Sequence, residues 1–166
     1  MKWLIFLNLL LFYFSAAFAQ NVGLDPIKER QFNRGIGISV NDNTRINAPI
    51  MSTVVNLSNE PIDDRNFGRY IEMVYHIFEG ERTINVFIVY SNVKTIFVEI
   101  GDVLLPGQHI GYTGGEGTII HNYNEFYIYV YTLEDTQILR DITNNAFLFE
   151  DKIYWWNPSF ILNFGR

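Results

Sequence analysis

Cysteine is absent from the 166-residue sequence. No disulfide can therefore brace the fold. A lipid anchor of the lipoprotein type, which is attached to a cysteine after a signal peptide, is also excluded. A chain of this length can nevertheless bury a core large enough to fold without covalent bracing.

Basic residues are also scarce. The chain has 12 Lys and Arg against 18 Asp and Glu, which gives a net charge of −6. The basic residues are scattered along the sequence rather than clustered. Nucleic acids and anionic membrane surfaces are therefore poor candidates for a partner, because both attract clusters of positive charge.

One long hydrophobic run stands at the start of the chain. Lys2 precedes an almost unbroken apolar stretch over residues 3–14, and the small residues Ala17 and Ala19 follow it. These features predict a secretory signal peptide over residues 1–19, with cleavage before Gln20. The run is shorter than the ~20 residues that span a bilayer, which argues against an uncleaved membrane anchor. We expect an N-terminal extension over 20–32 and one domain over 33–166.

Segments rich in Val, Ile, Tyr and Phe dominate the rest of the sequence, and Gly, Asn, Asp and Pro separate them. No internal repeat or interdomain linker is visible. Strands are predicted over residues 35–40, 46–57, 69–78, 82–90, 94–100, 109–113 and 126–133, with one or two more within 147–154. Short strands at this spacing predict an all-β fold, a single antiparallel β-sandwich or barrel.

Helix and loop signals are few. Asp25 followed by Pro26 predicts the start of a short helix in the N-terminal extension. Asn157 before Pro158 predicts a cap and one turn of helix that packs the apolar residues 160–162 on the sheet. The polar stretch 61–68, PIDDRNFG, is predicted to be a surface loop.

The stretch 98–117, VEIGDVLLPGQHIGYTGGEG, combines a Gly-Asp turn, a Pro-Gly turn and a glycine-rich loop. It resembles a phrase of the lysostaphin-type or LytM-like zinc endopeptidases, metallopeptidase family 23. The stretches 34–55, 67–76 and 157–162 add to the resemblance, which covers about residues 33–162. It implies the family's fold, a barrel-sandwich hybrid built on a duplicated hybrid motif, with only minor short helices.

Biotinyl and lipoyl carrier domains share part of this phrase in a related hybrid fold. They need a lysine at an exposed hairpin tip, and no residue between Ile96 and Tyr131 is a lysine. A carrier function is therefore a minor alternative.

The family resemblance implies a zinc ion held by two histidines and an aspartate, with a further histidine beside the metal-activated water. Every implied position differs in this chain. Asn33 and Gly37 replace the histidine and aspartate of the first motif, and Val89 replaces the assisting histidine. Glu125 and Tyr127 stand in place of a His-x-His pair. We therefore expect no metal, no other cofactor and no catalytic residue.

Three histidines remain to be considered as a relocated site. His76, His109 and His121 are not within metal-ligand spacing of one another, which favours three independent surface or strand-end residues. His121 with Glu125 is the pair expected nearest the former catalytic groove, so it is the pair to test for residual catalysis.

The segment 125–132, EFYIYVYT, alternates between two faces. Phe126, Ile128 and Val130 are expected to face the core, with glutamate and tyrosines on the other side. Tyrosine fits half-exposed strands, so that side can be purely structural. It can also form an aromatic groove floor for sugar rings or partner side chains. The possible binding groove comprises Glu125, Tyr127, Tyr129 and His121.

The favoured function is that of an exported, periplasmic or extracellular bacterial cell-envelope protein. It would be a LytM-like pseudoenzyme that binds peptidoglycan or regulates a partner cell-wall hydrolase. The alternatives are a peptidoglycan metalloendopeptidase with a non-standard site and a structural envelope domain without a ligand.

Overall fold

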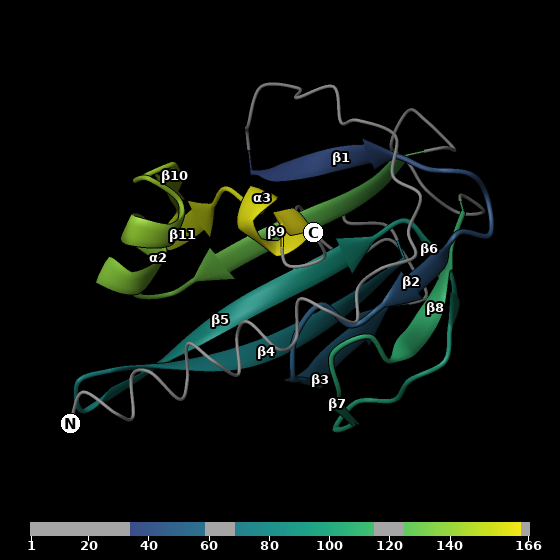
Figure 1. Cartoon of the computed structure of the whole chain (residues 1–166), viewed down its shortest axis with the longest axis horizontal. Helices are drawn as coiled ribbons and strands as arrows, with labels where there is room; N and C mark the ends of the chain where they lie inside the picture. Colours follow the sequence, from purple (N-terminus) through teal and green to yellow (C-terminus); the bar gives the residue numbers. More distant parts are fainter. Residues whose placement is uncertain (1–33, 59–68, 115–124, 164–166) are drawn as a thin grey trace.

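The computed structural model describes residues 34–58, 69–114 and 125–163, and antiparallel strands dominate these ranges (Figure 1). The strands are β1 (Gly35–Ser39), β2 (Arg45–Asn47), β3 (Ser52–Ser58), β4 (Tyr70–Glu79), β5 (Arg82–Ser91), β6 (Val93–Ile96), β7 (Val103–Leu104), β8 (His109–Thr113), β9 (Glu125–Thr132), β10 (Phe147–Glu150) and β11 (Ile153–Trp156). Two short helices in these ranges are α2 (Gln137–Ile142) and α3 (Ser159–Asn163). Neither is long and apolar enough to cross a membrane. The predicted all-β fold with minor short helices is confirmed.

The larger sheet has eight strands and is organised around β9. Its order is β10-β11-β9-β5-β4-β3-β7, and β1 also pairs with β9. One edge of β9 pairs with β5. The other edge is shared, because β1 pairs with residues 125–129 and β11 with residues 130–132. The first and last strands of the described chain thus lie end to end along one central strand.

The smaller sheet has the order β2-β8-β6. One strand predicted from the sequence is divided between this sheet and the larger one. The single strand expected over 46–57 is wrong, because β2 belongs to the small sheet and β3 to the large one. The break falls at Pro49, which has no N–H to donate to a ladder. Just before it, the Ala48 N–H donates to the Gln108 carbonyl, and the Ala48 carbonyl accepts from the Gly107 N–H. The chain passes there from one sheet to the other.

The strand predicted over 94–100 is also shorter than expected, since β6 ends at Ile96. A tight turn follows, in which the Glu99 N–H donates to the Asp102 carboxylate at 2.8 Å. Gly101 adopts a φ of 97°, a conformation that favours glycine. The Gly-Asp pair of the sequence therefore makes the expected turn, and the two-residue strand β7 follows it.

The sequence predicts helix α3 but gives no sign of helix α2. The cap predicted at Asn157, at the start of the C-terminal helix α3, is confirmed, because the Ser159 N–H donates to the Asn157 side chain at 3.0 Å. Helix α2 was not predicted, and its first N–H groups bond to Glu79 of β4, at 2.7 Å for Gln137. A cap supplied from more than fifty residues away leaves no local signature. The helix predicted after Asp25 and the loop predicted over 61–68 lie outside the described residues.

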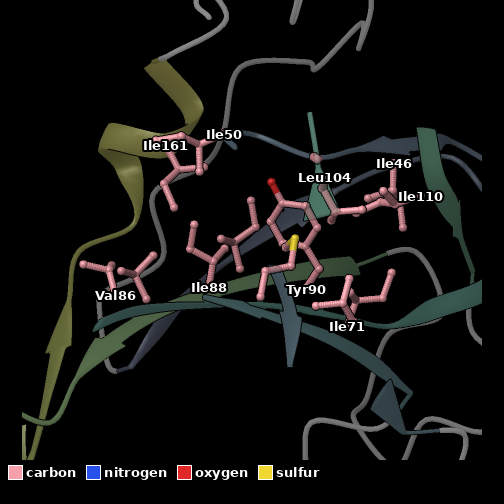
Figure 2. Packing of buried hydrophobic residues seen from close by; sticks show 14 of the residues in the cluster. Ile46, Ile50, Ile71, Val86, Ile88, Tyr90, Leu104, Ile110 and Ile161 are labelled. Carbon is pink, nitrogen blue, oxygen red and sulfur yellow. The ribbon is translucent and has the colours of Figure 1, made fainter. Parts of the chain in front are cut away.

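The main hydrophobic core lies between the two sheets (Figure 2). Ile46 and Ile110 of the small sheet pack toward Ile71 and Ile88 of the large one. Leu139 of α2 and Ile161 of α3 belong to the same core. Each fully buried aliphatic side chain of this kind contributes about 1.5–3 kcal/mol to stability.

Candidate functional site

Strand β9 presents its tyrosines on the face of the large sheet opposite the main core. Phe126, Ile128 and Val130 belong to the main core. Tyr131 belongs to a second, separate apolar cluster, and Tyr129 packs against that cluster. The alternation expected from the sequence is confirmed, so the tyrosines share one face of the sheet.

Strand pairing aligns the predicted site positions in two rows across this face. In the first row, Tyr127 lies between Gly37 of β1 and Ser91 of β5. In the second, Tyr129 lies between Gly35 of β1 and Val89 of β5. Gly37, Val89 and Tyr127, which lie far apart in the sequence, are thus brought onto three adjacent strands.

The two glycines of β1 let the tyrosine rings lie against its backbone. A β-carbon added at Gly37 would be 2.8 Å from Cε1 of Tyr127. One added at Gly35 would be 2.5 Å from Cδ1 of Tyr129 and 2.7 Å from the Ile128 carbonyl oxygen. Such approaches are closer than carbon atoms tolerate. The rings therefore fill the space that side chains on β1 would otherwise occupy.

Further aromatic side chains continue the row of rings along the sheet, and two of them, Tyr131 and Trp155, are buried, with 6% and 2% of their area exposed. We call the set the aromatic face, and it comprises Tyr127, Tyr129, Tyr131, Phe87 and Trp155. The Tyr127 and Tyr129 rings are stacked with centroids 6.3 Å apart. Tyr131 stacks on Phe87 at 4.8 Å and contacts Trp155 at 5.3 Å. Contacts of this kind contribute about 0.5–1.5 kcal/mol each beyond the area that they bury.

Polar groups border the aromatic rings. The Tyr131 hydroxyl donates a short hydrogen bond to Oε1 of Glu72, and Nδ2 of Asn56 donates to the Tyr70 hydroxyl at 2.9 Å. At the other end, the Arg34 guanidinium lies 5.8 Å from the centre of the Trp155 ring.

Burial changes the acidity of the central tyrosine. It raises the pKa of the Tyr129 hydroxyl to about 12, and the positive charge of Arg34 opposes that shift. Because burial disfavours the charged phenolate, Tyr129 stays a neutral hydrogen-bonding group above the ordinary tyrosine pKa of 10.0 as well as at physiological pH.

Some predicted site residues cannot be placed. Asn33 and His121 lie outside the described residues. Glu125 is described only through its backbone, which pairs with Ser39 of β1. The proposed groove of Glu125, Tyr127, Tyr129 and His121 therefore remains a prediction, with its two tyrosines on one face.

The two histidines within the described ranges belong to different sheets. His76 lies on β4, with Nδ1 2.9 Å from the Asn85 side-chain oxygen. His109 lies on β8 and contacts the rings of Phe97 and Tyr112, at centroid distances of 5.1 and 4.8 Å. Across residues 34–58, 69–114 and 125–163, no three or more His, Cys, Asp or Glu side chains are grouped to hold a metal ion.

Several residues of this surface were not singled out from the sequence. Phe87, Trp155 and Glu72 join the tyrosines through pairing between strands distant in sequence. The alternation within 82–91 could have indicated that Phe87 and Val89 share a face. Which strand lies beside which, and in what register, has no comparable local signal.

No protein-family model matches the sequence, and no curated protein does so either. Solved structures do match. A candidate M23 peptidase from Pseudomonas aeruginosa superimposes with a TM-score of 0.55 at 16% identity, over 89% of this chain and 53% of that one. This chain therefore spans about half the length of that protein. The likeness shows that the chain has the fold of the M23, LytM-like domains.

Two more solved structures align at lower scores. The catalytic domain of the antimicrobial peptidase lysostaphin from Staphylococcus simulans gives a TM-score of 0.48 at 16% identity, over 70% of this chain and 81% of that one. The protein LytU gives 0.47 at 17% identity, over 70% of this chain and 74% of that one.

Proposed function

We propose that this protein is an exported, non-catalytic LytM-like domain of the bacterial cell envelope. It binds peptidoglycan, or a hydrolase that acts on it, and does not cleave it. The observation that carries the proposal is the position of the Tyr127 ring against Gly37. An aromatic ring there fills the place where the family resemblance implies an aspartate and a histidine.

Apart from Glu125, the residues at these positions do not suit a zinc ion, and one carboxylate alone does not make a zinc site. Zinc in proteins is held by imidazole, thiolate or carboxylate groups. Gly37 offers no side chain and Val89 only a hydrocarbon, while Tyr127 offers a phenol whose ring packs on β1. The Asn33 amide is a neutral and weak ligand. We therefore derive no hydrolytic step for this site.

The aromatic face gives the domain a means of binding in place of catalysis. Tyr127 and Tyr129 are only partly buried and stack on each other. Flat rings with polar tips suit sugar rings and the apolar parts of peptides. The backbone of β1 beneath them holds the rings at fixed positions, which lowers the entropy lost when a ligand binds.

The experiment combines binding and cleavage on the same material. Purified mature protein is incubated with purified bacterial sacculi, and both the pelleted protein and the released muropeptides are measured. The expected result is retention on sacculi with no muropeptide release above buffer, while an active cell-wall hydrolase releases fragments in parallel.

Metal content is measured in the same preparation. After refolding with zinc, elemental analysis is expected to find no stoichiometric metal. One tightly held zinc per chain together with muropeptide release would support the metalloendopeptidase with a non-standard site. If the protein binds neither sacculi nor co-purified envelope proteins and releases no muropeptides, the result would support a structural domain without a ligand.

A further inference from the structure

Three partly buried carboxylates of the large sheet differ in their pairing. Glu150 on β10 accepts a hydrogen bond from Nε of Arg34 at 2.7 Å. Glu79 on β4 lies near Arg82 and caps α2. Glu72, also on β4, has no basic partner among the described side chains, and its hydrogen-bond partner there is the Tyr131 hydroxyl.

Glu72 belongs to the same face as the tyrosines. It pairs with Val89 of β5, which pairs in turn with Tyr129 of β9. Its carboxylate reaches the Tyr131 hydroxyl across β5. The charge therefore lies at the border of the aromatic face, two strands from Tyr129 and in contact with the Tyr131 hydroxyl.

A partly buried charge without a counter-charge is destabilising, and the cost falls when an opposite charge binds beside it. Aromatic rings attract cations through their electron-rich faces, and a neighbouring carboxylate strengthens the attraction. The net charge of −6 also favours the approach of a cation. An ammonium group fits these features better than a neutral sugar or a carboxylate does.

We propose that Glu72, with the aromatic face, receives a free amino group of a cell-wall peptide. This inference rests on the proposed function and specifies its ligand. The carboxylate oxygen Oε1 is engaged by Tyr131, which fixes the orientation of the carboxylate. Oε2 is the oxygen that accepts a hydrogen bond from the ammonium group.

The test compares Glu72→Gln with wild type in binding to purified sacculi. Glutamine keeps the shape and an oxygen that can accept from Tyr131, but it removes the charge. Its affinity is expected to fall about tenfold or more, as for a truncated charge pair at a binding surface. The matched control is Glu99→Gln, which removes the same charge from an exposed turn that follows the small sheet and is expected to bind like wild type.

A second arm changes the ligand instead of the protein. Sacculi whose free amino groups have been acetylated are expected to bind wild-type protein as weakly as untreated sacculi bind Glu72→Gln. Acetylation should then have little further effect on the variant. Thermal melts confirm that both variants are folded.

The outcomes separate the two proposals. If wild type binds sacculi and both Glu72→Gln and acetylation leave binding unchanged, the amino-group inference is overturned and the proposed function stands. If wild type does not bind sacculi at all, binding to peptidoglycan fails and the amino-group inference fails with it.

Discussion

Tyr127 and Gly37 face each other across the pairing of β9 with β1, and the tyrosine ring lies where a side chain on Gly37 would begin. Gly37→Ala should therefore destabilise the domain by about 1–3 kcal/mol, the usual cost of overpacking. Denaturant unfolding measures the change. Gly35→Ala should cost more, because its added carbon would also meet the rigid Ile128 carbonyl.

A double-mutant cycle supplies the control. In a Tyr127→Ala background the ring is gone, and Gly37→Ala should become neutral or stabilising by up to about 1 kcal/mol, because alanine has less backbone freedom to lose. Additive costs in the two backgrounds would show that the ring and the glycine are not coupled.

Removing the two partly exposed rings should abolish binding. Truncating a contact aromatic often costs ~2 kcal/mol or more, roughly thirtyfold in affinity. Tyr127→Ala combined with Tyr129→Ala should therefore eliminate retention on sacculi or on a co-purifying envelope partner. Retention is measured by co-sedimentation, with affinity from a titration.

The rings also pack on β1, so stability must be followed in the same variants. Phe97→Ala is the matched control, since it removes an exposed aromatic residue that directly follows β6 of the small sheet. A double variant that melts like wild type and still binds like wild type would place the binding surface elsewhere.

Alkaline pH should weaken the fold through Tyr129. Its pKa rises from the ordinary 10.0 to about 12 on folding, so the unfolded chain loses this proton first. The contribution is fully present below pH 10 and is lost as the pH rises toward 12. Tyr129→Phe should flatten the decline in the free energy of unfolding over this range. An equal slope in wild type and Tyr129→Phe would contradict the assignment.

Export is expected to remove residues 1–19. Mass spectrometry of protein secreted from a bacterial host should find an N-terminus at Gln20, as the small residues before it suggest. Recovery of the intact chain in the membrane fraction would favour the anchor alternative.

Local patterns predict the strands well and their pairing poorly. The alternation in 125–132 is a property of one segment, so the residues of that segment alone identify the two faces of β9. The pairing of Gly37 with Tyr127 follows only from the family resemblance. The break at Pro49 is missed because the apolar residues on both sides read as one continuous strand.

The polar residues that border the aromatic face could not be predicted from the sequence, for a different reason. Glu72 gains its place from a register that joins β4, β5 and β9. Nothing adjacent to it in sequence indicates that it meets Tyr131. The same holds for Glu79, whose carboxylate caps a helix formed more than fifty residues later.

Adjacent tryptophans on β11 lie on opposite sides of the large sheet. Trp155 belongs to the cluster on the aromatic face, whereas Trp156 is part of the main core and donates from Nε1 to the Thr132 hydroxyl at 2.9 Å. The sequence has three tryptophans, and the third lies within the predicted signal peptide. A protein cleaved before Gln20 would therefore carry two tryptophans, which are adjacent in the sequence. With Trp156→Phe the tryptophan emission should report on the packing of the apolar cluster beneath the aromatic face, and with Trp155→Phe it should report on the main core.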